Sequence, residues 1–332
     1  MIDGPRLFVV LQSGIVAAHL LADGREAWRV ELRTDRPVAA DDNRVFVASG
    51  EAIHALNAET SEVLWRAPVG TITSPLVAHQ GWVVAVTGAG VTALRAADGS
   101  KVWSRSTGAQ RERATIEGDN LYLPLDDGQV LALDLQTGAE RWSSRFTGPL
   151  SEVLATADRV YVGSADKYLY CLNAGTGRWT WDGWRVWIGA PLRGRPAADE
   201  TRVYVSSMDN ALRAYDRRDG ALRWHETVPF RPTRGPAVIG SRIVVPGTAA
   251  ELKAFDAATG QPSGQIALPS EPAVPPGFTA SGAETIVAAV TGSLGGEFML
   301  LVTQAPLPSI PLAPLTALPG IIVLVAPPAA QG

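Results

Sequence analysis

Short runs of apolar and β-branched residues recur along the chain, and polar turns separate them. RVFVAS (44–49), RVYVGS (159–164) and RVYVSS (202–207) alternate in the way of a strand that belongs to a sheet. The chain shows no window with the 3.6-residue period of an amphipathic helix of about ten residues or more. The pattern therefore predicts an all-β fold.

The turns between these runs repeat a common frame. An apolar residue leads into a turn that starts with Asp or Asn, a glycine follows, and a tryptophan stands four residues after the glycine. Asn and Asp cap such turns with their side chains, and glycine adopts a positive φ without steric cost. The frame is clearest at ALRAADGSKVW (93–103), ALDLQTGAERW (132–142), CLNAGTGRWTW (171–181) and AYDRRDGALRW (214–224). Ser61 replaces the glycine in one weaker copy, and Gly264 replaces the tryptophan in another.

The frame recurs at intervals of 37 to 43 residues. Its tryptophans are Trp28, Trp65, Trp103, Trp142, Trp181 and Trp224, and position 264 follows in the same frame. In the second unit the runs predict four strands, at 37–40, 44–48, 52–57 and 63–67, the first innermost and the last outermost. Four short antiparallel strands per unit of about 40 residues are typical of a β-propeller blade. We therefore expect a β-propeller of four-stranded antiparallel blades.

The blade count follows from the length of 332 residues. Seven framed units end near residue 268, and 269–332 are expected to form a degenerate eighth blade with strands at 285–292 and 297–304. Eight blades are therefore expected, with seven as the alternative, in a single domain over 1–332. The first unit has no evident inner strand, so the run at 320–327 is expected to join it and close the ring, which removes exposed sheet edges.

Composition and charge narrow the class of protein. Apolar residues make up 46% of the chain, so a disordered chain is excluded, and a net charge of −4 argues against nucleic-acid binding. Cys171 is the single cysteine, and the four histidines are scattered, so we expect neither a disulfide nor a metal cluster. No apolar run is long enough to span a membrane, and MIDGPRLFVV is not a complete signal peptide. We expect a monomer.

The repeat resembles the PQQ-like, or tryptophan-docking, repeat. RVYVGSADKYLYCLNAGTGRWTW (159–181) is the closest match, and the resemblance covers about residues 5 to 268. The resemblance implies that the framed tryptophans pack between neighbouring blades, where each large ring buries apolar surface. It is not a WD repeat, because Trp181–Asp182 is an isolated pair and Gly-His is absent.

The resemblance implies three possible functions. The chain is similar to the BamB-type proteins of outer-membrane protein assembly, which implies a non-catalytic protein-interaction scaffold. This similarity implies the periplasm or cell envelope as its compartment, with the cytoplasm as the alternative. A ligand-binding or sensor propeller is the alternative function. A PQQ-dependent dehydrogenase is the third, but such enzymes commonly carry adjacent cysteines and long insertions, which this chain lacks. We therefore expect no catalysis, and no PQQ or calcium.

Arginine gathers in the segments that would join the outer strand of one blade to the inner strand of the next. These segments lie on one face of a propeller, so they predict a basic channel mouth that docks an acidic protein segment or a small anionic ligand. In the alternative interpretation these arginines pair with Asp126, Asp127, Asp166 and Asp209 on the same face. The candidate binding residues are Arg36, Arg113, Arg193, Arg195, Arg231 and Arg234.

Three further candidates lie in the longest interval of the repeat. Trp184, Arg185 and Trp187 follow Trp181 closely, and tryptophan and arginine are enriched in binding hot spots. They either form a contact surface or extend a strand along the side of the propeller. Cys171 alternates into a strand, which predicts a buried and unreactive thiol. Asp126 and Asp127 are expected to form a β-turn, because the spacing of a calcium loop is absent.

Overall fold

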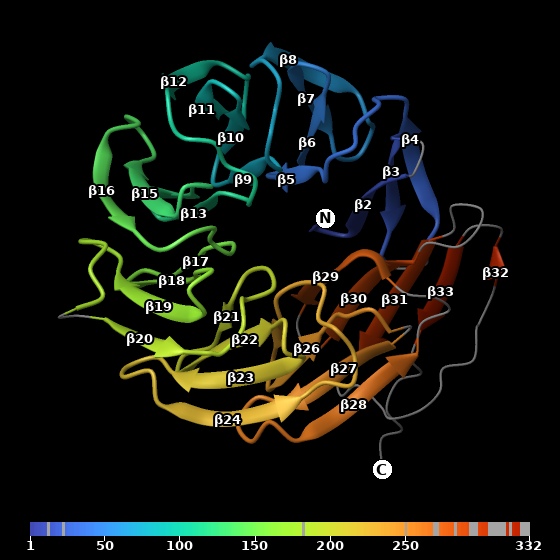
Figure 1. Ribbon diagram of the computed structural model, residues 1–332. Coiled ribbons are helices and arrows are strands. Elements are labelled where there is room, and N and C mark those ends of the chain that lie inside the picture. Colours follow the sequence, from blue (N-terminus) through green and yellow to red (C-terminus); the bar gives the residue numbers. More distant parts are fainter. Residues whose placement is uncertain are drawn as a thin grey trace.

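The computed structural model shows a ring of β-sheets whose inner strands face a common centre (Figure 1). It describes residues 1–11, 14–21, 24–180, 183–249, 251–267, 272–281, 284–291, 298–304, 317–318 and 321–325, with side chains up to residue 265 except that of Ile2. Its elements over these residues are all strands, which confirms the predicted fold class. Across the described residues, no helix has the length and hydropathy of a membrane span.

The first four sheets are antiparallel and have four strands each. Within each sheet we call the strands A, B, C and D, from the channel outwards. Sheet 1 contains β1 (Ile2–Asp3), β2 (Arg6–Val10), β3 (Val16–Leu20) and β4 (Glu26–Val30). Sheet 2 contains β5 (Ala39–Asp41), β6 (Arg44–Ser49), β7 (Ala52–Asn57) and β8 (Val63–Pro68). Sheet 3 contains β9 (Val77–His79), β10 (Trp82–Thr87), β11 (Gly90–Arg95) and β12 (Lys101–Arg105), and sheet 4 contains β13 (Thr115–Glu117), β14 (Asn120–Pro124), β15 (Gln129–Asp134) and β16 (Glu140–Arg145).

Three more four-stranded sheets and one of five strands continue the ring. Sheet 5 contains β17 (Leu154–Ala155), β18 (Arg159–Gly163), β19 (Tyr168–Asn173) and β20 (Trp184–Trp187). Sheet 6 contains β21 (Ala197–Ala198), β22 (Arg202–Ser207), β23 (Ala211–Asp216) and β24 (Leu222–Thr227). Sheet 7 contains β25 (Ala237–Ile239), β26 (Arg242–Val245), β27 (Glu251–Asp256) and β28 (Pro262–Ala267). Sheet 8 contains β29 (Pro272–Ser281), β30 (Glu284–Thr291), β31 (Phe298–Gln304), β33 (Ile321–Val325) and β32 (Ala317–Leu318).

A shared packing pattern explains why these repeats form sheets. In sheet 2, Phe46 on strand B, Ala55 on strand C and Trp65 on strand D lie side by side, and the two rings are 5.7 Å apart. The alanine leaves room for the rings to tilt together over it. A β-bulge next to the alanine turns the tryptophan towards the next sheet. The same bulge occurs beside the equivalent alanine in sheets 1, 3, 4, 6 and 7.

Tryptophans join the sheets across all six junctions between sheets 1 and 7. Each indole Nε1 donates a hydrogen bond to a backbone carbonyl in the turn between strands C and D of the next sheet. The pairs are Trp28 with Ala58 (3.0 Å), Trp65 with Ala96 (3.0 Å), Trp103 with Leu135 (2.7 Å), Trp142 with Ala174 (2.8 Å), Trp184 with Arg217 (2.9 Å) and Trp224 with Ala257 (3.0 Å). Buried apolar clusters extend across the same junctions.

In sheet 5 the docking residue differs from the predicted one. Trp184, not Trp181, pairs with Cys171 on strand C, packs 5.9 Å from Tyr161 and reaches sheet 6. The chain between strands C and D is longer here than in the other units, so strand D starts later than the tryptophan frame implied. Trp181 lies outside the described residues. In this unit the docking tryptophan therefore stands three residues after the position that the sequence frame predicts.

The closing strand was also predicted wrongly. Sheet 1 has its own inner strand, because Ile2 and Asp3 of β1 pair with Leu7 and Arg6 of β2. Ile321–Val325 instead pair in parallel with Phe298–Val302 of β31. A hairpin between neighbouring residues closes a much shorter loop than a return from residue 320, and it therefore costs less chain entropy. The predicted strands at 285–292 and 297–304 are confirmed to within a residue as β30 and β31.

Candidate functional site: the basic channel mouth

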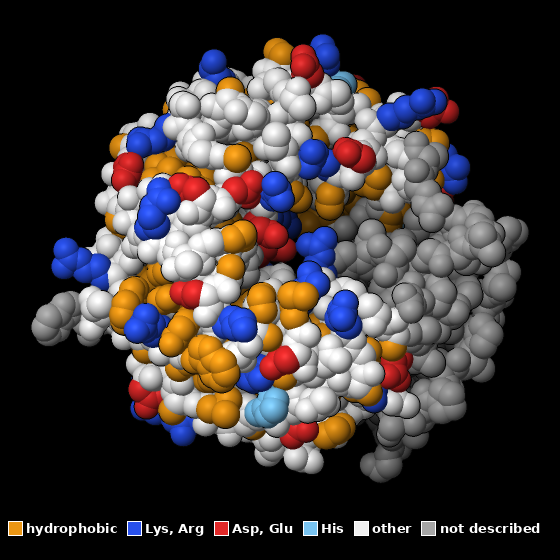
Figure 2. Space-filling model, in the orientation of Figure 1, with side chains coloured by type: hydrophobic (Ala, Val, Ile, Leu, Met, Phe, Trp, Pro, Cys, Tyr) orange, Lys and Arg blue, Asp and Glu red, His pale blue; other side chains and the backbone are white. Residues whose placement is uncertain are grey.

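The channel opens into a cavity of about 1970 Å³. Its wall consists of segments that join strand D to the next strand A and of turns between strands B and C, as the sequence predicted for this face. In Figure 2 the molecule is hollowed at the middle of the ring, with charged side chains around the opening. Seven arginines and three carboxylates line the cavity: Arg33, Arg36, Arg111, Arg113, Arg193, Arg195 and Arg234, with Asp35, Glu112 and Glu152. Its charge is therefore strongly positive.

Three charged residues occupy the same position in three successive sheets. Thr115, Leu154 and Ala197 pair with the strand-B tyrosines of sheets 4, 5 and 6. Arg113, Glu152 and Arg195 each precede these residues by two positions, so they project from equivalent points of the channel wall. Arg234 lies one position earlier in sheet 7, where Ala237 is the equivalent residue.

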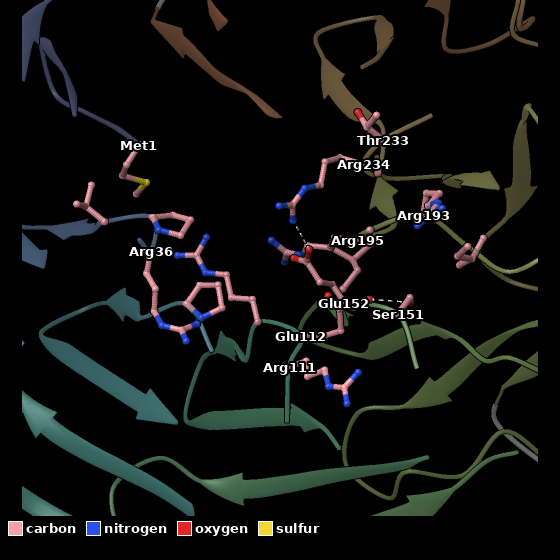
Figure 3. A pocket seen from close by; sticks show the side chains of 18 of the residues that line it. Met1, Arg36, Arg111, Glu112, Ser151, Glu152, Arg193, Arg195, Thr233 and Arg234 are labelled. Atoms are coloured by element: carbon pink, nitrogen blue, oxygen red, sulfur yellow. Dashed lines mark hydrogen bonds and ion pairs between the residues drawn. The ribbon is translucent and has the colours of Figure 1, made fainter. Parts of the chain in front are cut away.

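We call Arg113, Glu152, Arg195 and Arg234 the channel site. Glu152 is at its centre: its Oε1 lies 3.3 Å from Nη1 of Arg234, and its side chain is only 14% exposed. Figure 3 shows Arg195 and Arg234 reaching towards Glu152, with Arg36 on the other side of the cavity. In the described part of the chain, neither Arg113 nor Arg195 forms an ion pair within 4 Å.

The surrounding protein disfavours charge at this site. Burial lowers the pKa of the Arg113 guanidinium, and the Glu152 carboxylate acts in the opposite direction. The pKa of Arg195 is lowered for the same reason, and nearby Arg113 lowers it further. Arg195 is exposed to the water of the channel, and Arg113 is half-buried. Both arginines stay charged at physiological pH, because arginine ordinarily keeps its proton to a far higher pH.

Glu112 adds a second carboxylate near Glu152. Burial raises the pKa of Glu112, the Glu152 charge raises it further, and Arg234 opposes both effects. Proton uptake by Glu112 therefore occurs at a higher pH than for a free glutamate. Any such uptake makes the cavity more positive.

Two other arginines of this face, Arg111 and Arg145, form ion pairs with aspartates. Arg111 lies 3.3 Å from Asp126, and Arg145 lies 2.7 Å from Asp127, so the alternative interpretation of pairing holds for these two. Asp166 instead accepts a hydrogen bond from Tyr170, and Asp209 pairs with Arg213 of its own sheet. The Gly128 N–H donates to the Leu125 carbonyl at 3.1 Å, which is the hydrogen bond of the predicted β-turn at Asp126 and Asp127.

Three candidate arginines remain. We call Arg193 and Arg231 the rim arginines, and Arg36 is the third. Arg193 lines the cavity, and its buried Nε has no hydrogen-bond partner among the described residues. Arg231 is exposed and lies outside the cavity lining. Arg36 lines the cavity, with its Nε 3.9 Å from the carboxylate of Asp35.

The predicted Trp184, Arg185 and Trp187 surface is divided by the fold. Trp184 is 8% exposed and docks against sheet 6, so it is not available to a partner. Arg185 stacks over Trp179 and Tyr168, with its Cζ at 4.6 and 4.9 Å from the ring centres. Trp187 is 65% exposed on outer strand β20. These two therefore lie at the side of the propeller, away from the channel.

The acidic turns between strands A and B hold structure in place. Asp41 accepts the Gln80 and Gly81 N–H groups of the neighbouring sheet at 3.2 and 2.7 Å. Asp199 accepts the N–H groups of Thr201 and Arg202, both at 2.7 Å. Among the residues that the structure describes, no group of three or more potential metal ligands occurs.

Cys171 occupies the small-residue position of sheet 5. It lies between Tyr161 and Trp184, where the other tryptophan-bearing sheets have alanine. Burial raises the pKa of its thiol to about 12. The predicted buried thiol is therefore confirmed, and its role is packing.

Sequence reasoning missed two acidic residues that line the cavity and one aromatic residue at the side of the propeller. Glu152 and Glu112 were not singled out. An alignment of the repeats at the start of strand A would have placed Glu152 at the position that Arg113 and Arg195 occupy in their repeats. Trp179 was not singled out either, although it is one of the two rings that hold Arg185.

The comparisons with known proteins agree with this architecture. A family profile described as "Outer membrane protein assembly factor BamB" matches residues 12–153 and 145–275. The chain belongs to this family. BamB of Yersinia pestis is 28% identical over 185 residues, which cover 49% of this chain and 46% of that protein. BamB of Moranella endobia is 24% identical over 88% of this chain and 83% of that protein.

The BamB family is not the only source of similar sequences. The serine/threonine-protein kinase AfsK of Streptomyces griseus is 28% identical over 62% of this chain, which corresponds to 22% of that protein. The matches therefore span about half or less of the length of the Yersinia and Streptomyces relatives.

Solved structures share the fold of this BamB-family chain. BamB from Moraxella catarrhalis superposes with a TM-score of 0.69 at 19% identity, over 86% of this chain and 92% of that one. The quinohemoprotein alcohol dehydrogenase from Comamonas testosteroni superposes with a TM-score of 0.68 at 14% identity, over 88% of this chain and 70% of that one. At these identities the likeness concerns the fold alone.

Proposed function

We propose that this BamB-family chain is a non-catalytic protein-interaction scaffold that acts in outer-membrane protein assembly in the cell envelope. The observation that carries the proposal is the match of the BamB profile over residues 12–275. The basic channel mouth supports it, because a concave surface of one charge sign attracts and orients an acidic partner.

The rim arginines are the proposed docking residues. Arg193 and Arg231 lie in successive D–A segments of sheets 5 to 7, and for neither does the described chain provide an ion pair. Arginine forms bidentate hydrogen bonds with carboxylates, so an acidic segment of the partner suits this surface. We also propose that the chain acts without PQQ or calcium, since its one cysteine is used in packing.

The test is a cross-linked pull-down from the source cells, with the captured proteins identified by mass spectrometry. The variant is Arg193→Glu/Arg231→Glu. The matched control is Arg66→Glu/Arg178→Glu, which changes the charge equally at two exposed positions away from the channel. Loss of an envelope partner in the variant and its retention in the control supports docking at the rim. Equal capture by wild type and variant contradicts it.

A ligand-binding or sensor role is the second candidate function. The observation that favours it is the similarity to AfsK, a protein named as a serine/threonine-protein kinase. Under this alternative the basic mouth binds a small anion, and the pull-down recovers no reproducible partner.

A further inference from the structure

We propose that the channel site of Arg113, Glu152, Arg195 and Arg234 binds a doubly charged oxyanion, either a phosphate group or two adjacent carboxylates. The proposal concerns the channel wall and not the rim, so it holds whether or not a protein docks at Arg193 and Arg231.

The first argument is the charge count at the site. Three guanidiniums lie near the Glu152 carboxylate, with Glu112 as a second carboxylate close by, and Arg234 already pairs with Glu152 at 3.3 Å. Arg113 and Arg195 form no ion pair within 4 Å in the described part of the chain. The charges of Arg113 and Arg195 repel each other, and an anion between them removes this repulsion.

The second argument is the position of these charges. Arg113 and Arg195 each stand two residues before the inner strand of a sheet, β13 and β21, and these sheets are two apart in the ring. Both line a cavity within the protein, where an electrostatic interaction with an anion is stronger than on the open surface. The fork of N–H donors on each guanidinium suits a planar carboxylate or a tetrahedral phosphate.

The third argument concerns the charge of the ligand. Seven arginines and three carboxylates line the whole cavity, so a dianion is still attracted after the internal carboxylates are counted. The negative charges of Glu112 and Glu152 oppose the binding of an anion. The raised pKa of Glu112 reduces the negative charge that this residue carries. A cation is disfavoured by the same charges.

Glu152 has a specific role in this proposal. Its carboxylate occupies the donors of Arg234, and so it competes with an incoming anion. Removal of its charge frees a third guanidinium and raises the local positive charge by one. The proposal therefore predicts that Glu152→Gln binds the anion more tightly than wild type, which a purely structural role does not predict.

The experiment is isothermal titration calorimetry of the full chain with inorganic phosphate, and separately with a tetra-aspartate peptide. We expect binding of at least one probe in wild type. We expect at least a tenfold loss in Arg195→Gln, about the effect of removing hydrogen bonds to a charged group. A several-fold gain is expected in Glu152→Gln. Arg66→Gln, on outer strand β8, is the matched control and should bind as wild type does.

The outcomes separate the sources of the ligand. Phosphate binding indicates a free or ester phosphate, and binding of the peptide alone indicates carboxylates of a protein. Thermal unfolding of each variant checks that its fold is intact. If wild type and Glu152→Gln bind neither probe, or if Arg195→Gln binds as wild type does, the proposal is overturned. The pull-down at the rim is a separate readout, so either proposal can fail alone.

Discussion

The indole Nε1 of Trp184 donates a hydrogen bond to the backbone carbonyl of Arg217 at 2.9 Å, across the junction between sheets 5 and 6. The guanidinium of Arg217 returns to sheet 5 and donates to the hydroxyl of Tyr161 at 3.1 Å. Tyr161 in turn packs against Trp184. One residue of a turn in sheet 6 is therefore held by two aromatic residues of sheet 5, and the junction is closed by polar and apolar contacts together.

Truncation of a docking tryptophan should weaken the ring strongly. Trp142 is buried and bonded to Ala174, so Trp142→Ala should lower the free energy of unfolding by about 3–5 kcal/mol. Trp187 is 65% exposed, and Trp187→Ala should change it by no more than about 0.5 kcal/mol. Urea denaturation measures both. Equal effects of the two substitutions would contradict the docking role.

A glycine of the C–D turn should resist substitution because the tryptophan of the preceding sheet lies against it. Gly138 has a φ of +71°, and a Cβ there would lie 2.7 Å from the ring of Trp103. Gly118 has a φ of +53° with open space around it. Gly118→Ala therefore measures backbone strain alone, about 1–2 kcal/mol.

Gly138→Ala should cost about 1–3 kcal/mol more than Gly118→Ala, because the new methyl group collides with a packed ring. The measurement is again the free energy of unfolding in urea. Similar losses in both variants would mean that the ring moves aside freely. Ser61 has a φ of 63° at the equivalent place in sheet 2, which shows that the junction with Trp28 accommodates a Cβ.

Replacement of Cys171 by alanine should be mild. Alanine fills this position between two aromatic rings in sheets 1, 2, 4 and 6, so Cys171→Ala should cost less than about 1.5 kcal/mol. Cys171→Leu overfills the space between Tyr161 and Trp184 and should cost about 1–3 kcal/mol. The thiol should react with a disulfide reagent only after the protein is denatured. Rapid reaction in the native protein would contradict its burial.

Stability should fall in alkali, and Cys171 should contribute first. Its thiol has a pKa of about 12 in the folded chain and an ordinary value of 9.0. Between these values the unfolded chain loses the proton while the folded chain keeps it, so the free energy of unfolding falls as pH rises. The full slope for one proton is about 1.4 kcal/mol per pH unit.

The comparison of wild type with Cys171→Ala isolates this contribution. Unfolding in urea should be measured between pH 8 and 9, below the ordinary pKa of 10.0 at which the buried tyrosines would dominate. The stability of the variant should fall less steeply than that of wild type. Parallel curves would show that the thiol ionises equally in both states.

The repeat could be predicted because each unit encodes its own contacts. The Trp–Gly frame marks a ring and the turn residue that receives such a ring, and both are local features of sequence. The strands of the second unit were predicted within two residues of their ends for the same reason. The basic channel mouth was also predictable, since the topology of a propeller places all D–A segments on one face.

The sequence by itself thus determined the all-β class, the strand order within a blade and the face that carries the arginines. Only the tertiary structure decided that Trp184 docks in place of Trp181, because an insertion changes which ring reaches the next sheet. It also decided that Ile321–Val325 pair with β31 and not with sheet 1. The meeting of Arg113, Glu152, Arg195 and Arg234 depends on the register of strands about 40 residues apart. An alignment of the repeats shows that Arg113, Glu152 and Arg195 are equivalent, but only the ring decides that their side chains meet, and no pattern within a single repeat encodes this.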